Sequence, residues 1–147
     1  MVSPPTPSVR RAWIALAWLA ATLAGLLAAV WAVAWALEGG PVPSTATVAE
    51  ATHMAFPEGT EVVEADLAQM QSPTPGSRAE VTVDIPSEAF GDFLDANAME
   101  APLLAGTTPA GWASGIIPAG CGHESCWAAT IIVKDEAVTV TLHVTLI

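Results

Sequence analysis

The sequence predicts an α+β protein in which one N-terminal transmembrane helix anchors a small exported domain. Two observations predict this arrangement: an uncharged apolar run over residues 12–37 and, beyond it, stretches in which apolar and polar residues alternate. Alternation with a period of two is typical of half-buried strands. The expected order in the exported domain is β-β-α-β-β, which folds as a four-stranded antiparallel sheet with one helix on one face.

The apolar run reads AWIALAWLAATLAGLLAAVWAVAWAL and follows a short Pro-rich tail, residues 1–11. A helix of this length crosses a hydrocarbon core of about 30 Å with some tilt. Arg10 and Arg11 precede the run, so we expect the tail in the cytoplasm and residues 38–147 outside. Indole rings favour the membrane interfaces, and four tryptophans lie toward the two ends of the run: Trp13, Trp18, Trp31 and Trp35.

A cleaved signal peptide is the alternative to a permanent anchor in the plasma membrane. The stretch Ala34-Trp35-Ala36 fits a signal-peptidase pattern, and cleavage near Ala36 would release the domain. The apolar stretch of a signal is about 7–15 residues long, which is shorter than the run here. We therefore expect an uncleaved single-pass anchor, and under either interpretation the C-terminal part is exported.

Small residues recur at every fourth position of the run. A face of this kind lets two membrane helices approach closely, so it could support a helix-mediated dimer or packing on a larger membrane protein. The residues are Ala17, Ala21, Gly25 and Ala29.

The exported part is strongly acidic. From Glu38 onward it has two basic residues, Arg78 and Lys134, against all fifteen acidic ones, a formal charge of −13. Nucleic acid binding needs a cationic surface that displaces counterions from phosphates, so this class of partner is excluded. The acidity is typical of a soluble exported domain and would favour a cationic partner.

Residues 38–55 are rich in Gly, Pro, Ser and Thr and predict a flexible linker to the domain, residues 56–147. In the stretch 61–70, Val63, Ala65 and Leu67 alternate with acidic residues, and the stretch 79–85 alternates in the same way. The two stretches predict an antiparallel hairpin.

The segment 85–97 predicts a short helix. Pro86 and Ser87 suit a helix start, and Phe90, Phe93 and Leu94 fall on one face. At the C-terminal end, residues 126–133 and 138–147 predict a second hairpin, because the last stretch alternates strictly between aliphatic residues and threonine or histidine.

Residues 97–120 predict a long connection, with three Pro and four Gly and no clear period. Long ordered loops are often functional, so we expect a protein-binding surface here. Its candidate residues are Leu103, Leu104, Trp112, Ile116 and Ile117.

The stretch CGHESC, residues 121–126, combines both cysteines with a histidine and a carboxylate. Outside the cytoplasm a disulfide between Cys121 and Cys126 is the expected outcome. A zinc site using Cys121, His123 and Cys126 is an alternative, and a redox dithiol is another. The first lacks a second ligand pair, and the second lacks the two-residue spacing and the helix.

No catalytic motif is complete, and no cofactor is predicted. His-Glu-x-x-His fails because Trp127 occupies the place of the second histidine, and no Gly-x-Ser-x-Gly elbow exists. We therefore expect a non-enzymatic module that binds a protein partner. The alternatives are an exported metal-dependent hydrolase using His123 and Glu124, and an accessory subunit of a larger membrane protein.

The layout resembles that of many small, uncharacterised single-pass membrane proteins of high-GC actinobacteria. The resemblance covers the whole chain and rests on the arrangement of the anchor and domain and on a composition rich in Ala, Pro and Thr and poor in Lys. It implies a membrane location, and no activity follows from it.

Overall fold

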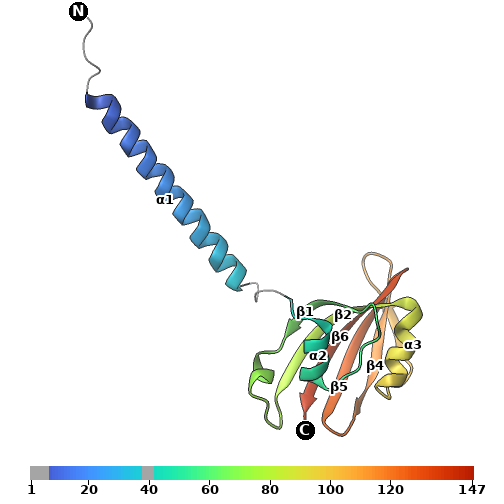
Figure 1. Ribbon diagram of the computed structural model, residues 1–147. Helices are drawn as coiled ribbons and strands as arrows, with labels where there is room; N and C mark the ends of the chain where they lie inside the picture. Colours follow the sequence, from blue (N-terminus) through green and yellow to red (C-terminus); the bar gives the residue numbers. More distant parts are fainter. Residues whose placement is uncertain (1–6, 38–41) are drawn as a thin grey trace, which may run out of the picture. The chain divides into compact units, whose positions relative to one another are not determined.

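The computed structural model describes residues 7–37 and 42–147, which fall into two compact units. Helix α1 (Pro7–Leu37) forms the first unit, and the residues from 42 onward form the second (Figure 1). Residues 1–6 of the predicted cytoplasmic tail and residues 38–41 of the predicted linker lie outside the described part of the chain.

Helix α1 is apolar on all sides. Its side chains are exposed from Ser8 to Leu37, and the only charges in this stretch are those of Arg10 and Arg11. At 1.5 Å per residue the helix is about 45 Å long, more than the hydrocarbon core of a bilayer. The prediction of an N-terminal helix long and apolar enough to span a membrane is confirmed.

Six strands form one antiparallel sheet in the second unit, in the order β1-β2-β6-β5-β4-β3. The strands are β1 (Glu61–Asp66), β2 (Arg78–Pro86), β3 (Leu103–Thr107), β4 (Ala113–Cys121), β5 (Ser125–Val133) and β6 (Ala137–Leu146). The predicted hairpins are β1–β2 and β5–β6, and β2 pairs with β6 at the centre of the sheet. The α+β class is therefore confirmed, whereas the predicted number of four strands is too small.

The two additional strands, β3 and β4, lie in the stretch that was predicted as an irregular connection. Apolar and polar residues do not alternate along β4. Ile116 and Ile117 are both apolar although they point to opposite faces of the sheet. Gly115 lies in close contact with β3, since a Cβ atom there would overlap the carbonyl oxygen of Leu103. The glycines that suggested a loop are thus compatible with a tight strand pair.

The core lies between one face of the sheet and a layer of helices and connecting segments. Inward-facing residues of β2, β5 and β6 alternate with outward-facing ones, and for β2 and β6 the sequence predicts this period. Helices α2 (Thr45–Thr52) and α3 (Phe90–Ala96) pack on the same face (Figure 1). The fully buried side chains include Val48, Val81, Val83, Ile85, Phe93, Val140 and Leu142.

Helix α2 corrects the prediction that residues 38–55 form a flexible linker. Ser44 caps the helix, with its Oγ accepting a hydrogen bond from the N–H of Thr47 at 3.2 Å. Val48 is fully buried in the core, and the Oγ1 of Thr45 donates to the carbonyl of Thr60. The alanines and threonines of this segment gave no apolar period, because Val48 is the only large apolar residue that the helix buries.

Helix α3 confirms the predicted short helix and its apolar face. Phe93 is fully buried, and Phe90 and Leu94 are partly buried against the core. The ring of Phe93 stacks on that of Phe56 at a centroid separation of 5.8 Å. A 3-10 turn, η2 (Ser87–Ala89), precedes the helix.

Strand β1 differs from the prediction in one respect. Val63 was expected to face the core with Ala65 and Leu67, but it is 49% exposed. The register with β2 shifts between Val62 and Glu64, which makes Val63 the extra residue of a β-bulge. Val62 packs on the core in its place.

Candidate binding surfaces

The outer face of the sheet changes in character from one edge to the other. One row of laterally paired residues crosses all six strands, and threonines form its centre. The row runs from a carboxylate on β1 to a leucine on β3, in the order Glu64, Thr82, Thr141, Thr130, Ile116 and Leu103.

The apolar end of this row belongs to a larger exposed surface on β3 and β4. Leu103 and Leu104 are each 58% exposed, and Ile116, paired with Leu103, is 48% exposed. No charged residue occurs from Ala101 to Gly122 in a chain that has fifteen acidic residues. We refer to Leu103, Leu104 and Ile116, together with the free side of β3, as the uncharged edge.

The opposite edge has the reverse composition. The exposed residues of β1 include Glu61, Glu64 and Asp66. Charged side chains and bulges on an edge strand discourage other strands from pairing with it. Both edge strands have a register irregularity, β3 between Leu104 and Gly106, but only β1 has charges as well.

The structure brings together three of the five residues that were predicted to bind a partner. Leu103, Leu104 and Ile116 form the uncharged edge, whereas Ile117 is 1% exposed and belongs to the core, so its assignment to a binding surface is wrong. Trp112 is partly buried at the β3–β4 turn, where its backbone N–H donates to the Oγ1 of Thr108 at 3.1 Å. Sequence alone did not separate Ile116 from Ile117 because the strand register was not known.

The predicted disulfide between Cys121 and Cys126 is present and joins the paired ends of β4 and β5. Gly122 closes the loop, with its N–H donating to the carbonyl of Ser125 at 2.8 Å. Both sulfurs are bonded to each other, so they are not thiolate ligands beside His123. The described residues contain no group of three His, Cys, Asp or Glu side chains that could hold a metal ion.

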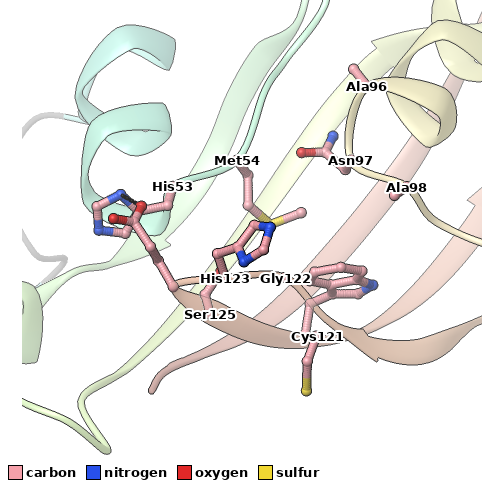
Figure 2. A pocket seen from close by; sticks show the side chains of 11 residues that line it. His53, Met54, Ala96, Asn97, Ala98, Cys121, Gly122, His123 and Ser125 are labelled. Atoms are coloured by element: carbon pink, nitrogen blue, oxygen red, sulfur yellow. Dashed lines mark ion pairs between the residues drawn. The ribbon is translucent and has the colours of Figure 1, made fainter.

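A cleft of about 390 Å³ lies beside this loop (Figure 2). Its wall includes an exposed imidazole, a buried thioether, an amide and an indole, which belong to His123, Met54, Asn97 and Trp127. The Asn97 amide is already engaged, since it hydrogen-bonds backbone groups of Ala55 and Phe93. The indole N–H of Trp127 is buried and has no hydrogen-bond partner among the described residues, and the ring packs closely over Gly120.

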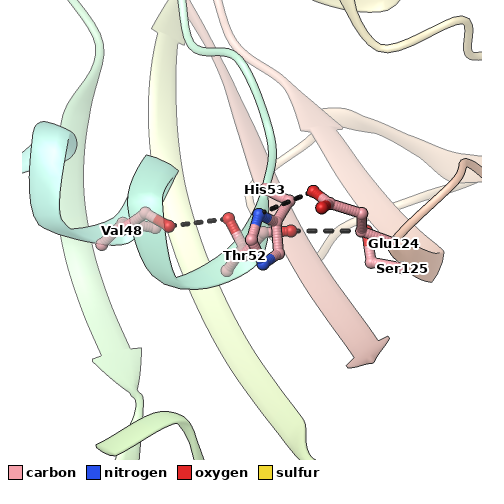
Figure 3. A network of polar contacts seen from close by, with 5 residues as sticks. All are labelled: Val48, Thr52, His53, Glu124 and Ser125. Carbon is pink, nitrogen blue, oxygen red and sulfur yellow. Dashed lines mark hydrogen bonds and ion pairs between the residues drawn. The ribbon is translucent and has the colours of Figure 1, made fainter. Parts of the chain in front are cut away.

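Two polar contacts join the loop of residues 121–126 to the C-terminal end of α2 (Figure 3). The Nδ1 of His53 lies 3.0 Å from a carboxylate oxygen of Glu124, and the Oγ of Ser125 donates to the carbonyl of Thr52 at 3.4 Å. Ser125 is buried, so its hydroxyl is a structural donor rather than an exposed nucleophile. His53 was assigned to the linker, and no sequence signal relates it to Glu124, because only the packing of α2 brings them together.

A second polar hollow, of about 380 Å³, lies on the acidic side of the sheet. It is lined by Asp66, Gln69, Arg78, Glu80 and His143, among others. His143 Nδ1 is 3.6 Å from Glu80, and both side chains are more than half exposed. This hollow is thus an open, solvated part of the surface.

The predicted anchor residues all lie on α1, where the four indole rings are exposed: Trp13, Trp18, Trp31 and Trp35. The small residues recur at intervals of four along the same helix: Ala17, Ala21, Gly25 and Ala29. Two of them line a shallow apolar hollow together with Ile14 and Trp18.

Comparison of the chain with protein-family models, with curated proteins and with solved structures finds no match. The function proposed below therefore depends on the geometry and charge of the chain itself.

Proposed function

We propose that this chain is a single-pass membrane protein whose C-terminal unit lies outside the cytoplasm and binds a protein partner. The uncharged edge is the observation on which this proposal depends. Leu103, Leu104 and Ile116 are exposed there beside the one edge strand that has no charged side chain. Extended segments of partner proteins bind free sheet edges by adding a strand, and exposed apolar side chains then contribute specificity.

Three features support the anchored and exported arrangement. Helix α1 is long and apolar enough to cross a bilayer. Arg10 and Arg11 lie before its apolar part, which favours a cytoplasmic N-terminus. The disulfide between Cys121 and Cys126 is typical of oxidising compartments outside the cytoplasm.

The proposal assigns a binding role rather than a catalytic one. The cleft beside residues 121–126 is the natural alternative, but its polar groups mostly have structural partners. Ser125 is buried and donates to Thr52, Asn97 is bound to backbone groups, and Glu124 is paired with His53. The exposed side chain of His123 alone does not make a nucleophile and base pair.

Photo-crosslinking from the uncharged edge tests this proposal. The photoreactive residue p-benzoylphenylalanine replaces Leu104 in the full chain, and intact cells are irradiated before the adducts are identified by mass spectrometry. A matched control places the same residue at position 63, which is similarly exposed on the acidic edge strand. We expect a defined protein adduct from position 104 and none from position 63. Equal yields from both positions, or no adduct from either, would contradict the proposal.

A further inference from the structure

We infer that the partner of the uncharged edge is a second copy of this chain, anchored in the same membrane, and that the two sheets pair β3 to β3 outside the bilayer. This inference rests on the proposed function, since it names the occupant of the same surface. It concerns the extracytoplasmic sheet and is separate from any association of two α1 helices.

Charge is the first argument for a second copy. The part of the chain from Glu38 onward has a formal charge of −13, so two copies repel each other across most of their surface. A two-fold interface uses the same patch of both copies, so a patch in which all charges are acidic would face another acidic patch. Of the two edge strands that the structure describes, β3 avoids this conflict, because residues 101–122 have no charge, whereas three of the six residues of β1 are acidic.

The chemistry of the edge is also self-complementary. Leu103 and Leu104 are exposed next to the free backbone of β3, so an antiparallel copy would place leucines against an apolar surface and join the two sheets. A cationic partner, which the overall acidity favours, would instead meet carboxylates at β1 and β2. There the exposed acidic residues include Glu61, Glu64 and Glu80.

The short length of β3 explains why membrane anchoring matters. A strand of five residues offers few backbone hydrogen bonds, and association in solution must overcome the loss of rotational and translational freedom. Anchoring two copies in one bilayer raises the concentration of each near the other, which has the same effect as a short linker. The pairing therefore forms between anchored copies and stays weak between detached domains.

Energy transfer between full-length copies in phosphatidylcholine vesicles tests the inference, because this protein is then the only partner present. Donor and acceptor fluorescent proteins are fused to the N-terminus, and the salt concentration is kept low so that charges act over several ångströms. Four samples are compared at one protein-to-lipid ratio: the unaltered chain, Leu104→Lys, Leu104→Glu and an equal mixture of the two variants.

A two-fold axis within a strand of five residues places the two copies of position 104 close to each other, so like charges there oppose pairing. We expect energy transfer for the unaltered chain, a fall to the level of random mixing for each variant alone, and recovery in the mixture. Recovery also shows that both variants are folded. The control Val63→Lys, on the other edge strand, should behave as the unaltered chain.

Two results would overturn the inference. Energy transfer that Leu104→Lys leaves unchanged would assign the association to α1 or to another surface. Energy transfer no greater than random mixing in the unaltered chain would exclude self-pairing. In either case the photo-crosslinking result decides the proposed function separately, because an adduct with a different protein would preserve partner binding while removing the second copy as the partner.

Discussion

Asn97, at the end of α3, hydrogen-bonds both backbone groups of Ala55, which lies after α2 and 42 residues earlier in the chain. Its Oδ1 accepts from the N–H of Ala55 and its Nδ2 donates to the carbonyl of Ala55, each at 2.8 Å. The Nδ2 also donates to the carbonyl of Phe93 at 2.8 Å. This amide therefore joins the two segments that cover the inner face of the sheet.

Removing this amide should weaken the domain. We expect Asn97→Ala to lower the free energy of unfolding by about 2–3 kcal/mol, since three hydrogen bonds of about 1 kcal/mol each are lost. Asn97→Asp keeps the acceptor for Ala55, so its free energy of unfolding should lie between those of the unaltered chain and of Asn97→Ala. Urea unfolding of the full chain in detergent micelles measures both values, and an Asn97→Ala variant as stable as the original would refute the role of the amide.

Ala98 should be a site of easy stabilisation. The N–H groups of Ala98 and Met99 bond the carbonyls of Asp95 and Leu94, which is the pattern of a Schellman cap, and Ala98 has a φ of 51°. An alanine in this left-handed conformation costs about 1–2 kcal/mol relative to glycine. We expect Ala98→Gly to raise the free energy of unfolding by about 1 kcal/mol in the same experiment. A loss of stability would show that the cap does not form.

The disulfide should contribute modestly to stability. It closes a loop of only a few residues, for which the loss of entropy in the unfolded chain corresponds to about 2 kcal/mol. We expect the paired variant Cys121→Ala with Cys126→Ala to stay folded and to lose about that amount. Complete unfolding on reduction would mean that the hairpin end has a much larger role than its short loop allows.

Gly115 should control whether β3 stays attached. A Cβ atom at this position would overlap the backbone of Leu103 and push β3 away from β4. We expect Gly115→Ala to increase hydrogen exchange at the amides of β3 while the central strands β2, β5 and β6 keep their protection. Gly91→Ala is the matched control, because a Cβ atom there meets nothing within 4 Å. Unchanged exchange in β3 would contradict this close approach.

The elements that the sequence predicted well are those whose burial follows a regular period. The strict alternation in β6 and the spacing of Phe90, Phe93 and Leu94 in α3 reflect one-sided burial, which a sequence records directly. Helix α2 was missed because only Val48 among its apolar residues is fully buried. Strands β3 and β4 were missed because glycine and proline interrupt them and adjacent isoleucines face opposite ways.

The candidate sites show the same limit. The disulfide could be predicted because the two cysteines are close in sequence and because cysteines in an exported domain are expected to oxidise. The uncharged edge was found only in part, since strand order decides which residues lie at an edge and which, like Ile117, lie in the core. The contact between His53 and Glu124 depends on long-range packing that no local pattern encodes.

The location of the C-terminal unit is the claim on which partner binding depends, and one labelling experiment tests it directly. Intact cells are treated with a membrane-impermeable maleimide, with and without prior reduction, and the mass shift on Cys121 and Cys126 is measured. We predict labelling only after reduction, which requires an exposed domain with a closed disulfide. Labelling that appears only after the cells are lysed would place the domain in the cytoplasm and contradict the account.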